Sequence, residues 1–472
     1  MRYLPNSDSD RAAMLKATGR SRVEELFEQI PADLRLRHRL DLPGPLSEPE
    51  ILEFFHQAAS QSSREYVSLL GAGAYNHYIP AAVNALLSRG EFFTAYTPYQ
   101  AEIAQGTLQA MFEFQTLMTQ LTGMEVSNAS LYDGSTATAE AVLMAMRITR
   151  RSRVLVARTL HPEYCQVLET FVRHQGSELQ QVPYTETGQL DLGGLESALG
   201  FGDDTAAVVV QSPNFFGTLE GVGKIAEVVH RSGALLIVTI TEPLSLALVK
   251  PPSEADLVCG EAQSFGVPVA FGGPYVGFLT AKEKFVRQMP GRLVGQTVDT
   301  EGRRGFVLTL ATREQHIRRE KATSNICTNQ SLCALAVTIY LSLLGKNGLR
   351  GLAEQNLAKA RYAANQLARI TGLAPRFSGP YFNEFVVRTP GDAEELLAEL
   401  QKQKIIGGLD LGRFYPELRN HVLVCVTETV SREAIERAVE AFRRAAASGP
   451  TAENAGAGAE LAECRTSGGG SA

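Results

Sequence analysis

Three residues at the start of a helix-like segment have the types and spacing of an anion site. Gly134, Ser135 and Thr136 open a long run, ATAEAVLMAMRITRR, that is typical of a helix. The first turn of a helix leaves backbone N–H groups free and carries the positive end of the helix dipole. This turn is therefore suited to bind a phosphate. The alternative is an ordinary helix cap without a ligand.

Two loops combine turn residues with aromatic side chains. Residues 70–80 read LGAGAYNHYIP and residues 94–100 read TAYTPYQ. Glycine, asparagine and proline indicate loops, and loops on a rigid scaffold often carry function. The candidate functional side chains in these loops are Tyr75, His77, Tyr96 and Tyr99. The alternative is surface turns with packed tyrosines.

A third polar segment lies at residues 310–328, LATREQHIRREKATSNICT. Arginine, serine and threonine suit phosphate recognition, because they supply several hydrogen-bond donors to one group of oxygens. Thr323, Ser324 and Asn325 are the candidates here. A solvated, basic helix start is the alternative.

The elements that must position these groups centre on residues 208–279. This stretch contains three short aliphatic runs, separated by turn residues and by one helix-like segment. Such a pattern predicts a parallel sheet built by crossovers. Val154 to Ala157 adds a further strand, and His161 follows it. The fold class is therefore α/β.

The rest of the chain suggests four parts. Residues 1–60 are predicted to form a helical arm with two capping boxes, Ser21 with Glu24 and Ser47 with Glu50. Residues 61–345 form the large domain. Residues 346–445 alternate helices and strands and are predicted to form a smaller α+β domain. Residues 446–472 are rich in Ala, Gly and Ser, which is typical of a disordered tail.

Composition excludes several classes of protein. The net charge of −6 argues against a nucleic-acid partner. We see no apolar run of the length of a membrane span, and no targeting pattern at the start, so we expect no membrane partner and a cytoplasmic protein. The six cysteines form neither a CxxC pair nor a cluster with zinc spacing, so no metal is predicted.

The loop sequences GAGAYNHYIP and YTPYQAEIAQG, together with residues 310–328, closely resemble the P-protein family of the glycine cleavage system. The resemblance covers residues 1 to about 445. It implies the pyridoxal-phosphate-dependent transferase fold (fold type I, aspartate aminotransferase-like), with a mostly parallel sheet in the large domain. In that fold the Gly134–Thr136 turn would hold the cofactor phosphate, and His161 would stack on the pyridine ring.

Two positions depart from the pattern that the fold implies. Thr239 stands at the position of the aspartate that pairs with the pyridine nitrogen, and Ser264 stands at the position of the lysine that binds the cofactor. Glu242 lies three residues beyond Thr239 and is an alternative carboxylate. Gly134, Ser135, Thr136, His161, Thr239 and Ser264 would then form a vestigial site that binds no pyridoxal phosphate covalently.

The resemblance further implies the N-terminal half of the P-protein, which some organisms make as a separate chain. Such a chain would be inactive alone. It would pair with subunit 2, which carries the pyridoxal phosphate, in an α2β2 heterotetramer. The assembly would decarboxylate glycine and pass the aminomethyl group to the lipoylated H-protein. Tyr75, His77, Tyr96 and Tyr99 would line the partner's site, and Thr323, Ser324 and Asn325 would approach the partner's cofactor phosphate.

Two other hypotheses remain open at this point. The chain is either a non-catalytic scaffold that only stabilises the cofactor-bearing partner, or an independent pyridoxal enzyme with a relocated lysine, for which Lys321 is the candidate.

Overall fold

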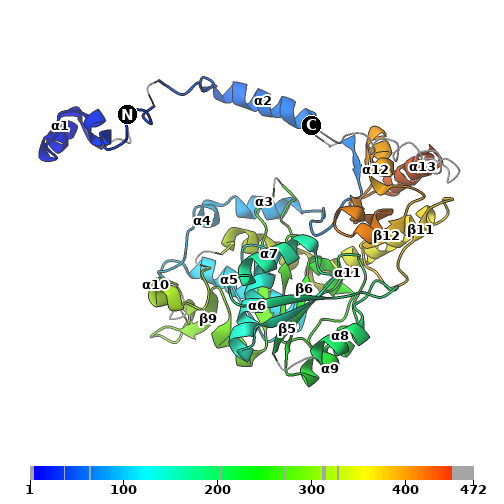
Figure 1. Cartoon of the computed structure of the whole chain (residues 1–472). Helices are drawn as coiled ribbons and strands as arrows, with labels where there is room; N and C mark the ends of the chain where they lie inside the picture. Colours follow the sequence, from blue (N-terminus) through cyan, green and yellow to red (C-terminus); the bar gives the residue numbers. More distant parts are fainter. Residues whose placement is uncertain are drawn as a thin grey trace, which may run out of the picture. The chain divides into compact units, whose positions relative to one another are not determined.

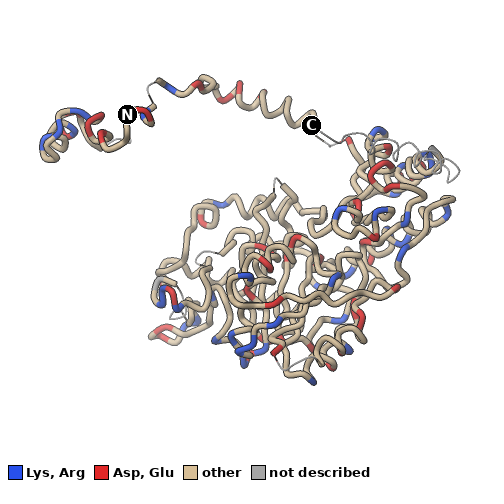
Figure 2. Tube along the Cα trace, in the orientation of Figure 1, with Lys and Arg blue, Asp and Glu red and all other residues tan. Residues whose placement is uncertain are grey.

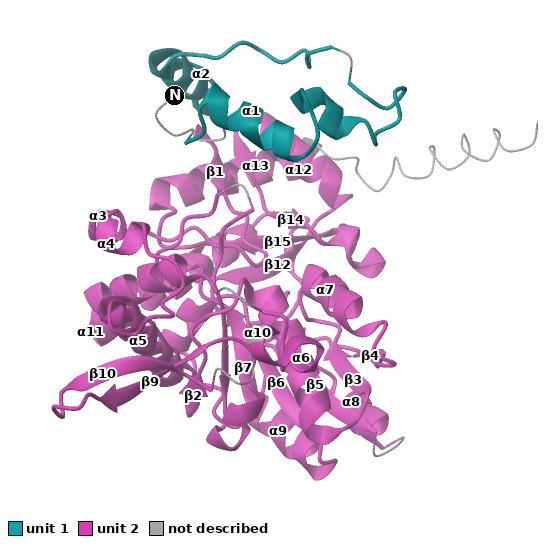
Figure 3. Ribbon diagram, turned by 90° about the vertical axis from the view of Figure 1, so that its left-hand side faces the viewer, with its two compact units in different colours: residues 1–64 teal, residues 65–472 magenta. Residues whose placement is uncertain are grey.

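The computed structural model describes residues 5–36, 38–62, 65–200, 204–270, 272–310, 315–326 and 329–448. The chain forms two compact units, Met1–Arg64 and Glu65–Ala472. Figure 3 shows the two units in different colours. The tail predicted for residues 446–472 lies, from residue 449 on, outside the described residues.

The first unit is helical, as predicted, and buries nothing within itself. It contains α1 (Asp8–Ala17), the 3-10 helix η1 (Val23–Phe27) and α2 (Glu48–Ser60), none of which has a buried residue. The box of Ser47 with Glu50 is confirmed, since Ser47 donates its backbone N–H to Glu50 at 2.7 Å. The other box is wrong by one residue, because Ser21 donates to Glu25 instead of Glu24. The helical turn begins one residue later than predicted, with Arg22 as its N-cap residue, so Glu25 takes the third helical position.

The second unit is built on a seven-stranded sheet (Figure 1). All neighbouring strands are parallel except for the antiparallel strand β8, so the predicted mostly parallel α/β fold is confirmed. The central strands are buried along their whole length. In spatial order the strands are β2 (Val126–Ser127), β8 (Gly277–Ala281), β7 (Leu257–Glu261), β6 (Leu235–Ile240), β5 (Thr205–Gln211), β3 (Arg153–Ala157) and β4 (Glu178–Val182).

Alternate side chains of these strands fill two hydrophobic cores, one on each face of the sheet. In β6, Ile237 packs with α6 (Gly134–Thr149) and α7 (Pro162–Val172). Val238 and Ile240 belong to the other core, with α5 (Gln105–Thr122), α8 (Leu192–Leu199), α9 (Val222–Arg231) and the first half of α11 (Ser331–Leu367). Thr239 therefore points to the α6 face, where the anion turn lies.

A smaller antiparallel sheet follows toward the C-terminus, as the sequence predicted. It has the order β11 (Ala374–Pro375), β12 (Glu384–Arg388), β15 (His421–Cys425) and β14 (Leu409–Asp410). Its core includes residues of α12 (Ala393–Lys402) and α13 (Arg432–Ser448), together with Ala360, Ala363 and Leu367 of α11. Strand β1 (Val67–Ser68) pairs in parallel with β13 (Ile405–Ile406).

Helix α11 contributes residues to one core of the larger sheet and to the core of the smaller sheet. It runs for 37 residues, with non-helical backbone angles at Gly345. Gly345 breaks α11 into two helical segments, so the domain boundary predicted at residue 345 coincides with this break, and it stays a prediction. Contrary to our expectation that no such run exists, α11 is long and apolar enough by composition to cross a membrane, the one such helix in the described chain. Residues of α11 are buried in the cores of both sheets, and a core helix of a soluble protein passes the same test of length and composition.

The remaining elements lie around the sheet. Residues 299–303 join β9 (Leu293–Val298) to β10 (Arg304–Thr309) in an antiparallel hairpin. Short helices α3 (Ala81–Leu87), α4 (Gly90–Phe93) and α10 (Gln315–Arg318) border the two tyrosine loops and the polar segment. Charges of both signs are interspersed along the second unit (Figure 2). In the described chain no group of His, Cys, Asp or Glu is arranged to hold a metal ion.

Candidate functional site

The start of α6 is already occupied by carboxylates of the chain itself. Asp133 is the N-cap residue, and its Oδ1 accepts the N–H of Thr136 at 2.9 Å and the hydroxyl of Ser135 at 2.6 Å. Glu261, the last residue of β7, accepts the N–H of Gly134 at 2.9 Å through Oε2. Two carboxylates thus take the place in which the sequence predicted a phosphate.

Both carboxylate oxygens of Glu261 accept hydrogen bonds from backbone N–H groups. Its residue is 1% exposed, and Oε1 accepts the N–H groups of Val276 at 2.9 Å and Gln263 at 3.1 Å. Burial raises its pKa to about 7, while these backbone hydrogen bonds favour the charged form. A methyl group placed on Gly134 would lie 2.3 Å from Tyr164 Oη and 2.9 Å from the backbone nitrogen of Glu261. The residues present do not fit a cofactor phosphate at this turn.

The two departures predicted from the sequence lie beside this turn. Thr239 is fully buried, with Oγ1 3.3 Å from Thr138 Oγ1 and 3.7 Å from Cys259 Sγ. A neutral hydroxyl there offers no negative charge to a pyridine nitrogen. Ser264 lies in the turn after β7, and its buried Oγ has no hydrogen-bond partner within the described chain. Neither side chain can do the work of the aspartate or the lysine that the fold implies.

His161 is a capping residue in this structure. Its Nε2 donates to the carbonyl of Ala72 at 2.8 Å, and its Nδ1 accepts the N–H of Glu163 at 3.2 Å. The ring lies 4.7 Å from Phe215 and 5.0 Å from Tyr164, between ring centroids. Burial lowers its pKa, so the ring is neutral at pH 7. Side chains of this chain pack where we expected a pyridine ring.

His77 lies between two buried carboxylates. Its Nε2 is 2.9 Å from Glu242 Oε2 and its Nδ1 is 2.8 Å from Glu428 Oε2, and all three side chains are at most 6% exposed. Burial disfavours the charged ring, but the charge of Glu242 and the hydrogen bonds to both carboxylates outweigh it and raise the pKa of His77 to about 10. Both ring nitrogens then donate, as only an imidazolium allows. Glu242 is thereby committed to His77 and does not replace the missing aspartate.

Asparagines complete this buried group, which we call the His77 cluster: His77, Glu242, Glu428, Asn383 and Asn356. Asn383 donates to Glu242 at 2.9 Å and Asn356 donates to Glu428 at 2.8 Å. Glu242 follows β6, Asn383 precedes β12 and Glu428 follows β15. Asn356 belongs to α11, and His77 belongs to the loop at residues 70–80. The cluster therefore fixes this loop between the two sheets.

Tyr75 is fixed in the same way. It is 2% exposed, and its hydroxyl donates to Glu384 at 2.7 Å, while the other oxygen of Glu384 accepts the N–H of Ala72 at 2.6 Å. Burial raises the pKa of Glu384 to about 7. The side chains of Tyr75 and His77 both point into this chain, and that this loop lines a partner's site stays a prediction. The loop at residues 70–80 is therefore held by hydrogen bonds to buried side chains of the same chain.

The second tyrosine loop is open to solvent. Tyr96 is 80% exposed and Tyr99 is 58% exposed. With Phe93 and Ile103, also exposed, they form what we call the tyrosine face, and Tyr96, Tyr99 and Ile103 line a hollow of about 580 Å³. The buried Arg292 supports it, with its guanidinium carbon 5.5 Å from the ring centre of Tyr99. These two predicted tyrosines are therefore available to a partner or a substrate.

Thr323, Ser324 and Asn325 lie along another hollow, of about 970 Å³, on the outer side of α6. Arg147, Arg150 and Arg151 line the same hollow, together with the carboxylates of Glu140, Asp204 and Glu320. That its hydroxyl and guanidinium donors recognise a phosphate stays a prediction. Glu140 is buried beneath them, and burial raises its pKa. Lys321 is exposed in the short helix η6 (Arg319–Lys321), outside β7 and the turn that follows it.

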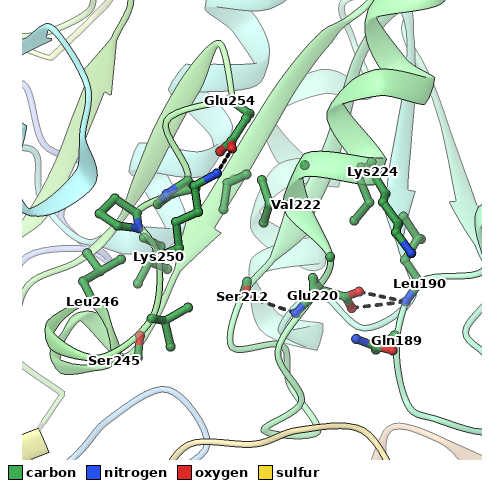
Figure 4. Close-up of a pocket in the computed structure, with 18 of the residues that line it drawn as sticks. Gln189, Leu190, Ser212, Glu220, Val222, Lys224, Ser245, Leu246, Lys250 and Glu254 are labelled. Carbon is green, nitrogen blue, oxygen red and sulfur yellow. Dashed lines mark hydrogen bonds and ion pairs between the residues drawn. The ribbon is translucent and has the colours of Figure 1, made fainter.

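A further pocket, of about 460 Å³, lies on the opposite face of the sheet, between the start of α9 and the loop that follows β6 (Figure 4). Its polar groups are engaged: Glu220 accepts the N–H of Leu190 and the amide of Asn214, and Lys250 pairs with Glu254. None of the predicted site residues lines it, and no group in it points to a ligand.

Sequence reasoning missed Glu261, Glu384 and Glu428. Glu261 did carry a signal, since a carboxylate at the end of a fully buried strand must find donors nearby. Glu384 and Glu428 carried none, because their partners Tyr75 and His77 are more than 300 residues away along the chain.

The seven-stranded, mostly parallel sheet with its smaller C-terminal sheet is the fold of pyridoxal-phosphate-dependent enzymes of fold type I. Glutamate decarboxylase of Lactobacillus brevis shares it with a TM-score of 0.66 at 12% identity, over 89% of this chain and 97% of that one. Sphingosine-1-phosphate lyase of Burkholderia pseudomallei shares it with a TM-score of 0.64 at 16% identity, over 92% and 97%. These two likenesses show the fold alone.

The chain belongs to the glycine cleavage system P-protein family, whose model matches residues 1–442. It is 56% identical over 441 residues to the probable glycine dehydrogenase (decarboxylating) subunit 1 of Koribacter versatilis, covering 93% of this chain and 99% of that protein. The same subunit of Solibacter usitatus is 56% identical over 443 residues, covering 93% and 97%. A crystal structure of inhibitor-bound glycine decarboxylase (P-protein) superposes with a TM-score of 0.85 at 43% identity, over 94% and 100%. The family resemblance predicted from the loops is confirmed.

Proposed function

We propose that this chain is the cofactor-free subunit of a two-chain glycine decarboxylase. With subunit 2 it would decarboxylate glycine and pass the aminomethyl group to the lipoyl arm of the H-protein. The observation that carries this proposal is the α6 turn, where Glu261 and Asp133 occupy the place of a phosphate beside Thr239 and Ser264. A chain of a decarboxylase family that cannot seat the cofactor must act through another chain that does.

Pyridoxal phosphate bound in the partner supplies the electron sink for decarboxylation. This chain would line part of the partner's pocket and supply hydrogen-bond donors to it. Thr323, Ser324 and Asn325, with Arg147 behind them, are grouped as donors for a phosphate that approaches from outside. The tyrosine face would cover the substrate side of the partner's pocket or the entry of the lipoyl arm. We propose an α2β2 assembly in the cytoplasm, without nucleic-acid or membrane partners.

The direct test is glycine–bicarbonate exchange by each chain alone and by both together, with a count of pyridoxal phosphate per complex. We expect no exchange from this chain alone, exchange from the mixture, and one pyridoxal phosphate per pair of chains. Full exchange by subunit 2 alone, or pyridoxal covalently attached to this chain, would contradict the proposal.

The burial of Tyr75 and His77 favours a second candidate, a scaffold that only stabilises subunit 2. Thr323→Ala separates the two, because Thr323 lies on the surface hollow and its loss should not unfold the chain. A contributing subunit predicts reduced exchange and a raised KM for pyridoxal phosphate in the mixture. A scaffold predicts unchanged exchange with the same complex stoichiometry.

A further inference from the structure

The α6 turn differs from a site that has merely lost its ligand. A site emptied by loss of its lysine would still present free N–H groups at the start of the helix. Here the N–H of Gly134 is bound by Glu261 and that of Thr136 by Asp133. Glu261 also takes the N–H groups of Gln263 and Val276, so three backbone donors converge on one carboxylate.

Backbone N–H groups surround a bound phosphate in a similar way, with several donors pointing at one anion. Tyr164 closes the remaining side, since its Oη lies 2.3 Å from a methyl group placed on Gly134. The carboxylate is therefore held inside an anion slot built from backbone donors.

We infer that Glu261 is an internal replacement for a ligand phosphate, which closes the idle pocket of this chain to pyridoxal phosphate and to other phosphate esters. The sequence places this carboxylate at the end of β7, on the same strand that leads to Ser264. The slot thus keeps its donors and its shape, but the chain supplies the anion itself. This inference goes beyond the proposed function and does not rest on glycine as substrate.

A consequence for the assembly follows. If both chains of a pair had an open phosphate slot, the cofactor would divide between a pocket with a lysine and a pocket without one. A slot filled by Glu261 leaves the partner's pocket as the place in which pyridoxal phosphate binds.

The test uses the isolated full-length chain, with inorganic phosphate as the probe and thermal unfolding as the readout. The hollow lined by Arg147 and Thr323 is present in every variant, so any rise in Tm that phosphate gives the wild type over sodium chloride of equal ionic strength is the baseline for comparison. Glu261→Ala removes the anion and leaves three donors unsatisfied, so its Tm should fall. Phosphate, or formate as a smaller anion, should then restore about 2 °C or more of Tm in a saturable way.

Two further variants make the outcome specific. Glu261→Gln fills the slot without a charge and should gain no more from phosphate than the wild type. Glu384→Ala removes another fully buried carboxylate that accepts a backbone N–H but does not lie at a helix start, and phosphate should not restore its Tm. A wild type stabilised by phosphate as strongly as Glu261→Ala would overturn the inference. So would a folded Glu261→Ala chain that no anion stabilises.

A binding measurement keeps the inference testable if Glu261→Ala does not fold. Saturable binding of pyridoxal phosphate that is competed by inorganic phosphate and persists in the Arg147→Ala chain, where the outer hollow is impaired, would overturn it without any variant at Glu261. Failure of the exchange assay with subunit 2 would instead contradict the proposed function and leave the anion slot untouched.

Discussion

The Nε2 atom of His77 lies 2.9 Å from Oε2 of Glu242, in a region where both side chains are 1% exposed. His77 comes from a glycine-rich loop and Glu242 from the end of a central strand, 165 residues further on. Glu428 holds the other ring nitrogen at 2.8 Å. One charged ring thus ties the loop, the seven-stranded sheet and the smaller sheet together.

Replacing His77 by alanine should destabilise the fold strongly. The two buried carboxylates would lose their shared cation, and breaking a buried ion pair on one side costs about 3–5 kcal/mol. Chemical unfolding of the isolated chain measures this. The exposed His174 gives a matched control, for which His174→Ala should change stability by less than about 0.5 kcal/mol. Equal stability of the two variants would contradict the charged cluster.

The same ring predicts a dependence of stability on pH. The pKa of His77 in the folded chain, about 10, lies above its ordinary value of 6.5. Its contribution is therefore fully present below pH 6.5 and is lost as the pH rises through 10. Between these values the wild type should lose stability more steeply than His77→Ala, by roughly 1 kcal/mol per pH unit. Parallel curves for the two proteins would rule this out.

Glu384 predicts the opposite kind of linkage. Its folded pKa of about 7 lies above the ordinary 4.5, so the protonated form is favoured on folding. The ionised carboxylate destabilises the fold, and this cost develops as the pH rises from 4.5 through 7. Glu384→Gln should remove that part of the pH dependence while retaining most contacts to Tyr75 and Ala72. Unfolding curves at pH 5 and pH 8 measure the difference between variant and wild type.

Tyr96 should matter for activity and not for stability. Its side chain is 80% exposed, so Tyr96→Ala is expected to change the free energy of unfolding by less than about 0.5 kcal/mol. In the assembly with subunit 2 we expect glycine–bicarbonate exchange to fall about tenfold, the equivalent of one lost contact of roughly 1.4 kcal/mol. Tyr362→Ala, on α11 away from the tyrosine face, is the control and should leave exchange unchanged.

Most of the fold could be predicted because its elements are local patterns. Three aliphatic runs were predicted at residues 208–279 and four strands are present, because the last run contains both β7 and the antiparallel β8. The helical pattern after Thr136 belongs to α6. The box of Ser47 and Glu50 held because it spans one helical turn. The box of Ser21 with Glu24 failed because η1 begins after Arg22, which places Glu25 at the third helical position.

The site was predicted less well, since its contacts join distant parts of the chain. The loop with Tyr75 and His77 has the composition of an exposed loop, and nothing near it in sequence signals Glu384 or Glu428. Thr239 and Ser264 were found because the resemblance aligned a position, not because of a contact. Glu261 lies only three residues before Ser264, yet its bond to Gly134 depends on how β7 and α6 pack.

Helix α11 has a consequence for how this polypeptide can be divided. Its first half, with Val337 and Tyr340, backs the larger sheet, and its second half, with Ala360 and Ala363, backs the smaller one. A cut at residue 345 would fall at the break between the two helical segments of α11 and would remove Leu349 and Ala353 from the core of the larger sheet. The segment after Gly345 packs into the cores of both sheets, so truncation at this break does not separate the two lobes cleanly.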